Sequence, residues 1–181
     1  MKAITIWQPW ATLLACGAKQ FETRSWATNY RGSIAIHAAA KSINSVIKEC
    51  FPLGEWNYHP DYEAKRRFLN AVGFSLLEPM NELPLGAVIG TAELINCWYI
   101  VHNPGTNIDV AKHIPIGAES MTTDKHAPDF SDYIVPTETE LLFGDWTPGR
   151  YAWELSNVKI LDNPIPAKGQ QGLWNWDDAH G

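Results

Sequence analysis

Segments with the composition of β-strands recur from one end of the chain to the other, and this pattern constrains the fold most. The long apolar run at 86–100, with a bend at Gly90, is expected to form a buried strand. Further strands are expected at 3–7, 21–26, 32–38, 150–156 and 158–161. A short helix is expected at 9–16, with Pro9 in its first turn and Gly17 as a left-handed stop. We therefore expect an α+β fold with a mainly β core, a small mixed or antiparallel barrel with short flanking helices.

Three other stretches do not have a strand pattern. Residues 41–70 are helical in character, and residues 102–148 look irregular. The aromatic tail 168–176, which is interrupted by glycines, is expected to dock on the rest of the domain. The length of 181 residues suits one domain over 1–181 with its own core.

Composition excludes several classes of protein. No run of about 18 apolar residues occurs, and the N-terminus lacks a secretory signal, so a cytoplasmic protein without a membrane span is expected. Cys16, Cys50 and Cys97 form no Cys-x-x-Cys pair, and the six histidines lack metal-ligand spacing. We therefore expect no metal and no cofactor.

Charge is distributed unevenly along the chain. The net charge is −6, which argues against a protein that grips long duplexes. Residues 1–50 carry six basic and two acidic side chains (+4), whereas residues 101–146 carry two basic and eight acidic ones (−6). An anionic ligand should therefore meet the N-terminal third, and the acidic 101–146 stretch is a candidate surface for a protein partner.

A cluster of charged residues follows the expected helix. Gly17 ends the helix, Lys19 leaves the turn, and the next strand carries Glu22 and Arg24 to one face because strand side chains repeat every two residues. One interpretation is an ion-pair network that fixes the turn. The other is a partly buried ligand site, in which Glu22 accepts from a base amino group, Arg24 donates to a carbonyl or phosphate, and Lys19 stabilises an oxyanion.

These residues carry a resemblance to a known family. The chain resembles the ASCH domain (activating-signal-cointegrator homology), including its bacterial and phage members, through Ile6-Trp7-Gln8-Pro9-Trp10-Ala11, Gly17-x-Lys19-x-x-Glu22-x-Arg24, Ser25-Trp26, Tyr30-Arg31-Gly32, Phe143-Gly144-Asp145, Pro148-Gly149-Arg150-Tyr151-Ala152-Trp153 and Pro164-Ile165-Pro166. Residues 41–82 and 99–142 look like insertions. The resemblance implies a PUA-like β-barrel with a cleft beside the first helix, and action on RNA, modified nucleosides or other nucleic acids.

Some similar small proteins hydrolyse N4-acetylcytidine with a Lys and a Thr of this motif and a remote Glu. This chain has Glu22 at the Thr position, and Thr23 would point to the opposite face of the strand. Glu93 is the one acid in 86–100 and is the candidate for the remote carboxylate, with a structural role in the barrel as the alternative.

The remaining candidates flank the cluster. Trp7 and Trp26 are candidate stacking platforms for a base, with core filling as the alternative. Gln8 reads a base edge or caps the helix, Arg31 contacts phosphate or the solvent, and His37 is expected to be structural.

Three functions therefore remain open. The first is binding of RNA, single-stranded nucleic acid or a modified nucleoside through Trp7, Gln8, Lys19, Glu22, Arg24, Trp26 and Arg31. The second is a hydrolase in the same pocket, an amidohydrolase or ribonuclease, with Lys19, Glu22 and Glu93 as catalytic residues. The third is a protein-interaction domain in which the ion network is structural.

Overall fold

The computed structural model describes residues 1–43, 45–46, 83–103, 108–113 and 133–177. Nearly all of the helical stretch predicted at 41–70, and most of the insertion predicted at 41–82, lie outside the described residues. Residues 104–107 and 114–132 of the second predicted insertion lie outside them as well.

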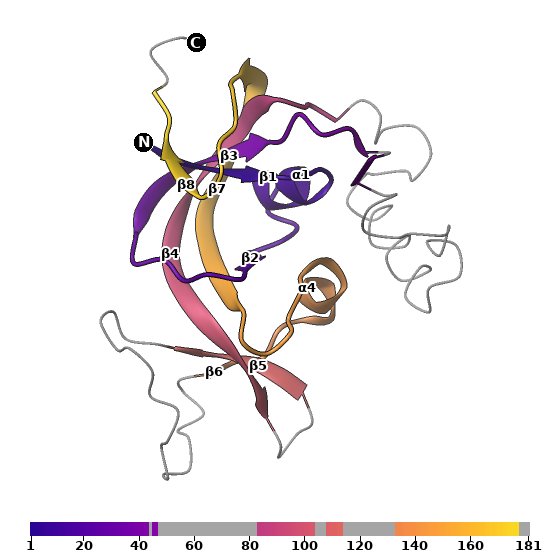
Figure 1. The fold of residues 1–181 in the computed structure, drawn as a ribbon, viewed down its shortest axis with the longest axis vertical. Coiled ribbons are helices and arrows are strands. Elements are labelled where there is room, and N and C mark those ends of the chain that lie inside the picture. Colours follow the sequence, from indigo (N-terminus) through magenta and orange to yellow (C-terminus); the bar gives the residue numbers. More distant parts are fainter. Residues whose placement is uncertain (44, 47–82, 104–107, 114–132, 178–181) are drawn as a thin grey trace.

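One curved, mixed sheet dominates the fold, in the order β2-β7-β4-β3-β1-β8, and β5 and β6 extend it from β4 (Figure 1). The β1–β3 pair is parallel and the other pairs are antiparallel. The strands are β1 (Lys2–Ile6), β2 (Phe21–Arg24), β3 (Gly32–Ala38), β4 (Ala87–Asn103), β5 (Ile108–His113), β6 (Tyr133–Ile134), β7 (Tyr151–Pro166) and β8 (Leu173–Asn175). This confirms the expected α+β, mainly β and barrel-like fold.

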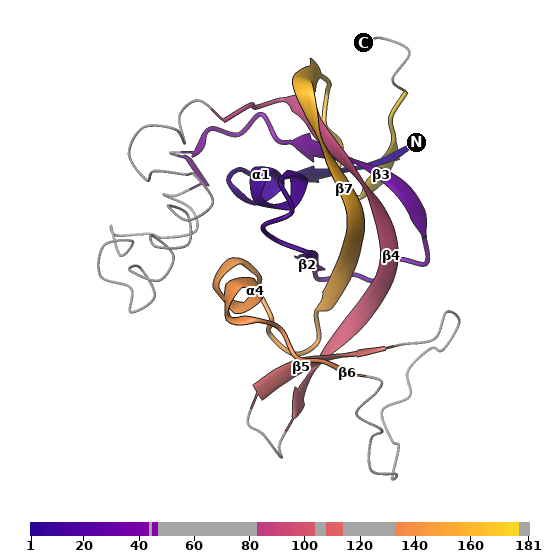
Figure 2. The ribbon, with the colours of Figure 1, turned by 180° about the vertical axis from the view of Figure 1, so that it is seen from behind.

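Among the described residues, two short helices flank the sheet, α1 (Trp10–Ala15) and α4 (Glu138–Phe143). Buried Leu13 of α1 and Phe143 of α4 belong to the same apolar cluster, so the two helices pack against each other. In both ribbon views β2 runs between them (Figures 1 and 2).

The second half of the chain differs from expectation in two places. The two strands predicted at 150–156 and 158–161 are one strand, β7, which continues through Asn157 at a φ of 48°. Asparagine tolerates this left-handed conformation better than most residues. The stretch 102–148, expected to be irregular, contains the end of β4, β5, β6 and α4.

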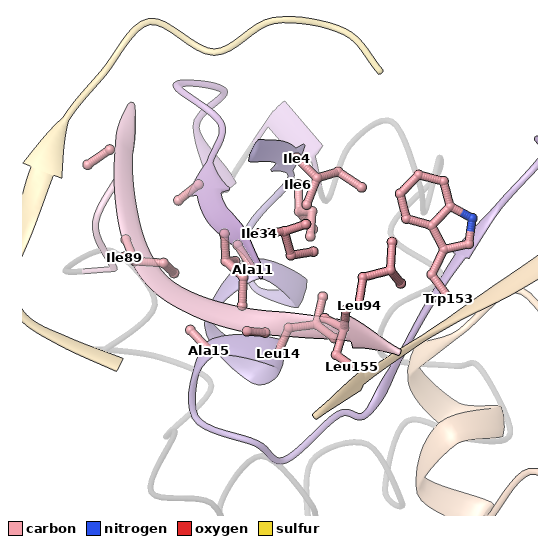
Figure 3. Packing of buried hydrophobic residues seen from close by; sticks show 14 of the residues in the cluster. Ile4, Ile6, Ala11, Leu14, Ala15, Ile34, Ile89, Leu94, Trp153 and Leu155 are labelled. Carbon is pink, nitrogen blue, oxygen red and sulfur yellow. The ribbon is translucent and has the colours of Figure 1, made fainter. Parts of the chain in front are cut away.

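The main core lies between α1 and the curved sheet (Figure 3). Leu14 and Ala15 of α1 pack on strand residues that include Ile4, Ile34, Leu94 and Leu155, all buried. The approach of α1 to the sheet is close at Gly90, where an added Cβ would lie 2.9 Å from the carbonyl oxygen of Lys159 and 3.1 Å from the Cβ of Ala15. Glycine at this position therefore permits the contact.

The aromatic tail docks as expected. It forms β8 against β1, and the N-terminal amine donates to the carbonyl of Trp176 at 2.7 Å. Within the described part of the chain, none of the helices has the length and apolar character needed to cross a membrane.

Candidate functional site

The turn after α1 places Lys19 inside the protein. Gly17 adopts a φ of 78° and donates to the carbonyl of Leu14, and the Lys19 amide donates to the carbonyl of Leu13 at 2.9 Å. These bonds satisfy carbonyls at the end of the helix and turn the chain back toward the core. As a result Lys19 is only 1% exposed.

Strand β2 carries Glu22 and Arg24 on the same face, as their spacing predicts. Arg24 Nη2 lies 3.0 Å from Glu22 Oε1 and donates to the carbonyl of Thr5 at 3.0 Å. The Glu22 carboxylate is nearly buried, whereas about a quarter of the Arg24 side chain (27%) is exposed. Arg24 therefore lies at the rim of the cluster and Glu22 lies below it.

A fourth charged residue, Glu140 of α4, completes the cluster. Lys19 Nζ lies 3.8 Å from Glu22 Oε2 and 3.9 Å from Glu140 Oε2. Both distances exceed those of a hydrogen bond. Among the described residues, Lys19 Nζ, Arg24 Nε and Glu140 Oε2 are buried polar atoms without a hydrogen-bond partner.

Sequence reasoning missed Glu140 because it belongs to the acidic stretch that was assigned to an insertion. Its Oε1 accepts from the backbone amides of Gln20 and Phe21, so α4 is tied to the start of β2. One signal for this helix was present. Thr137-x-x-Glu140 is a capping-box spacing, and Thr137 does accept from the Glu140 amide at 3.3 Å. The Glu140 carboxylate, however, reaches across to the cluster.

Burial shifts the pKa of two members in opposite directions. Desolvation lowers the pKa of Lys19, although Glu22 and Glu140 oppose this shift. Desolvation raises the pKa of Glu140, against the effects of Lys19 and the two backbone amides. Both shifts favour the neutral form of the group concerned.

The flanking tryptophans are placed differently from each other. Trp7 is 37% exposed, and Lys41 Nζ lies 3.8 Å from its ring centroid. Trp26 is half-buried and meets Trp153 edge to face, with ring centroids 4.5 Å apart. Trp7 therefore offers more accessible ring surface than Trp26.

Gln8 and Arg31 make hydrogen bonds within the fold. Gln8 is fully buried, donates to the carbonyl of Pro84 and accepts from the amide and hydroxyl of Thr12. Of the two roles considered for Gln8, this geometry favours the cap of α1. Arg31 donates to the carbonyls of Thr28 (2.9 Å) and Tyr30 (2.8 Å) and to the side-chain oxygen of Asn96 (3.4 Å).

Glu93 lies away from the cluster. It accepts from the Ser33 hydroxyl, and its groove is also lined by Thr91 and Lys159. Its neighbours Ala92 and Leu94 point into the main core, so Glu93 points to the opposite face of β4. The structure thus brings Lys19, Glu22 and Arg24 together, and Glu140 of α4 is the carboxylate from a distant part of the chain that lies beside them.

Three buried atoms of the cluster have unused hydrogen-bonding capacity among the described residues. Lys19 Nζ and Arg24 Nε require an acceptor, and Glu140 Oε2 accepts a donor. A planar amide-like group, with a carbonyl oxygen beside an N–H, offers both. Nucleobase edges have this pattern.

Comparison with known proteins agrees with the motif. The family model of the ASCH domain matches residues 4–159. Activating signal cointegrator 1 of Homo sapiens is 34% identical over 94 residues, which cover 52% of this chain and 14% of that protein. The Mus musculus protein of the same name is 33% identical over the same shares. The chain thus matches only about one seventh of the length of these relatives. Since the family model covers most of the chain, the chain belongs to the ASCH domain family.

Proposed function

We propose that the protein binds a nucleobase, in RNA or in a modified nucleoside, at the cluster of Lys19, Glu22, Arg24 and Glu140. The observation that carries the proposal is the set of buried polar atoms without partners. Each such atom costs about 1–3 kcal/mol when it stays unsatisfied. A base edge whose amino group donates to Glu22 and Glu140 and whose acceptor faces Lys19 would recover part of that cost.

Position and charge also support the proposal. Three of the four cluster residues lie in the N-terminal third, whose first 50 residues carry a local charge of +4. Trp7 lies next to the helix that leads to Lys19, and its ring, which also contacts Lys41 Nζ, is exposed enough to stack against a base. Gln8 is a positioning residue in this proposal, because it fixes α1.

The test is a panel of ribonucleosides, N4-acetylcytidine and short single-stranded RNA and DNA, with binding read by tryptophan fluorescence. We expect saturable binding of at least one base, weakened about 10- to 100-fold in Glu22→Gln, since a hydrogen bond to a charged group contributes about 1.5–3 kcal/mol. Flat signals across the panel would contradict the proposal and favour a protein-interaction domain.

A hydrolase in the same pocket is the second candidate. Its specific support is the lowered pKa of Lys19 beside a carboxyl group whose pKa is raised. Such a pair suits general acid–base work, with Glu22 or Glu140 as base and Lys19 as stabiliser of an oxyanion. Glu93 is less suited to this role from its place on the opposite face of β4.

Product formation from N4-acetylcytidine distinguishes this candidate from simple binding. Turnover by the wild type that disappears in Glu140→Gln would select the hydrolase. If N4-acetylcytidine and short RNA bind but neither is hydrolysed, only the binding proposal remains.

A further inference from the structure

A row of tyrosines crosses the sheet next to the cluster. The backbone register pairs Arg24 on β2 with Tyr151 on β7, and Tyr151 with Tyr99 on β4. From Tyr99 the register continues to Lys112 on β5 and then to Tyr133 on β6. Residues paired directly across antiparallel strands point to the same face. Tyr151, Tyr99 and Tyr133 therefore share the face of the sheet that carries Glu22 and Arg24.

The neighbouring row shows which face this is. Ile100, Ala111 and Ile134 are paired in the same way, one position along, and belong together to an apolar cluster with Trp146. Successive strand residues alternate between faces, so the tyrosine row lies on the face opposite that cluster. Tyr99, Tyr151 and Tyr133 are all only half-buried.

The tyrosines begin where the core ends. Trp153, which is paired with Glu22, is fully buried. Two residues along each strand, at the next pair on the same face, Arg24 and Tyr151 are partly exposed. Tyr99 and Tyr151 contact each other, with ring centroids 5.2 Å apart and planes tilted by 49°. The aromatic surface is thus continuous with the rim of the proposed base site.

We propose that this row, the tyrosine track of Tyr151, Tyr99 and Tyr133, binds the nucleotides that adjoin the one held at Lys19 and Glu22. This inference rests on the proposed function and makes its ligand a single-stranded nucleic acid instead of a free nucleoside. From β2 to β6 the row spans four strand spacings, about 19 Å. That length accommodates several nucleotides, since a stacked strand advances about 3.4 Å per nucleotide.

The residue types in the tyrosine track indicate a single-stranded nucleic acid as its ligand. Aromatic side chains in a row beside a basic residue are the usual platform for bases of a single strand, which stack with little regard to sequence. Arg24, at the rim between the cluster and Tyr151, is placed for the phosphate that links the first two nucleotides. The net charge of −6 and the acidic stretch 101–146, which contains Tyr133, disfavour a duplex or many phosphate contacts, so the track would bind a short single strand by stacking more than by charge.

The experiment measures the affinity of the full chain for the four ribonucleosides, for RNA dinucleotides and for RNA hexanucleotides. The variants are Tyr151→Ala, Tyr99→Ala and Tyr133→Ala, each with its Phe counterpart. Ile160→Ala, an exposed position elsewhere on β7, is the control.

We expect hexanucleotides to bind more tightly than nucleosides. Each Ala variant should weaken hexanucleotide binding about 5- to 150-fold and leave nucleoside binding within about twofold of the wild type. The Phe variants, which keep the ring, and Ile160→Ala should stay close to the wild type. Tyr151→Ala should already affect dinucleotides, whereas Tyr133→Ala should affect only the longer probes.

Two results would overturn the track. One is a hexanucleotide that binds no more tightly than a nucleoside, and the other is equal hexanucleotide affinity in the wild type and the Ala variants. If nucleosides still bind in a way that depends on Glu22, the proposed base site survives either result. If none of the nucleosides or oligonucleotides binds the wild type, both proposals are contradicted. If the three tyrosines bind a protein partner and the chain binds no nucleic acid, the proposal of a nucleotide-binding track is also wrong.

Discussion

At the residue scale, the cluster combines features that a surface ion-pair network would not have. Lys19 is 1% exposed, and its amine lies beyond hydrogen-bond distance from both carboxylates. Burial of a charge with imperfect pairing costs several kcal/mol, so such an arrangement is weak support for stability. A ligand whose polar groups pair with these buried charges would explain the arrangement more simply.

Glu140 has separable structural and electrostatic roles, which two substitutions distinguish. Glu140→Gln keeps an oxygen for the amides of Gln20 and Phe21 and should fold with a melting temperature near that of the wild type. It removes a negative charge that raises the pKa of Lys19, so NMR titration of the Lys19 side chain should give a lower pKa than in the wild type.

Glu140→Ala is the contrasting variant. It leaves both amides without that partner, at about 1–3 kcal/mol each, and should lower the free energy of unfolding measured by urea denaturation. Equal stability of the Gln and Ala variants would show that the two hydrogen bonds do not hold α4 to β2.

The residue scale also shows what the sequence could predict. Lys19, Glu22 and Arg24 could be placed together because a helix stop and the two-residue period of a strand are local rules. Glu140 could not, because it lies 118 positions from Glu22 (140 − 22) and reaches the cluster only through packing of α4. Glu93 had the right chemistry, but a strand's face relative to a distant site depends on the bulges and register of the sheet.

At the scale of elements, local patterns predicted the elements with strong signals. The strand expected at 32–38 is β3, and the helix expected at 9–16 is α1 with one residue less at each end. Helix α4 was missed because six residues are too few for a visible period, and its one cue was the Thr137 cap. Strand β7 was split because Asn157 looks like a turn residue, although the pairing with β4 carries the strand through it.

The contact between α1 and β4 yields a prediction about Gly90. Gly90→Ala would force a Cβ against the Lys159 carbonyl and Ala15. Overpacking of this kind costs about 1–3 kcal/mol, so the urea midpoint should fall without a change in the denaturant slope. A variant as stable as the wild type would mean that α1 is free to move away from β4.

The docked tail makes stability depend on pH through His37. His37 is buried, its Nε2 lies 2.9 Å from the carbonyl oxygen of Ala167, and its Nδ1 has no partner among the described residues. Burial lowers the pKa of His37 below 6.5, so the unfolded chain takes up a proton at a higher pH than the folded one. The stability contributed by the neutral ring is therefore full above about pH 6.5 and is lost as the pH falls toward the folded pKa.

Melting temperatures measured between pH 7.5 and 5 check this sign. The wild type should lose stability through this range, and His37→Gln should show a flatter profile. Parallel profiles of the two proteins would rule out His37 as the titrating group.

At the scale of the whole molecule, charge sets how nucleic acid is approached. The net charge of −6 and the +4 balance of residues 1–50 together predict a local contact with few phosphates. For a single strand, each neutralised phosphate contributes about 0.7 to the slope of log affinity against log salt concentration. We expect a slope of about −0.7 to −2 for RNA hexanucleotides and only weak binding to duplex DNA. Tight binding that ignores sequence, with a steep slope, would contradict this picture.

We propose that the cluster of Lys19, Glu22, Arg24 and Glu140 is held for a ligand and not for stability. The decisive variant is Lys19→Met, with calorimetric binding of the ribonucleoside that binds best and the melting temperature measured on the same samples. We expect at least a tenfold loss of affinity and a melting temperature within about 4 °C of the wild type, equivalent to about 1–2 kcal/mol. Unchanged affinity together with a much lower melting temperature would contradict it and make the cluster a structural ion network.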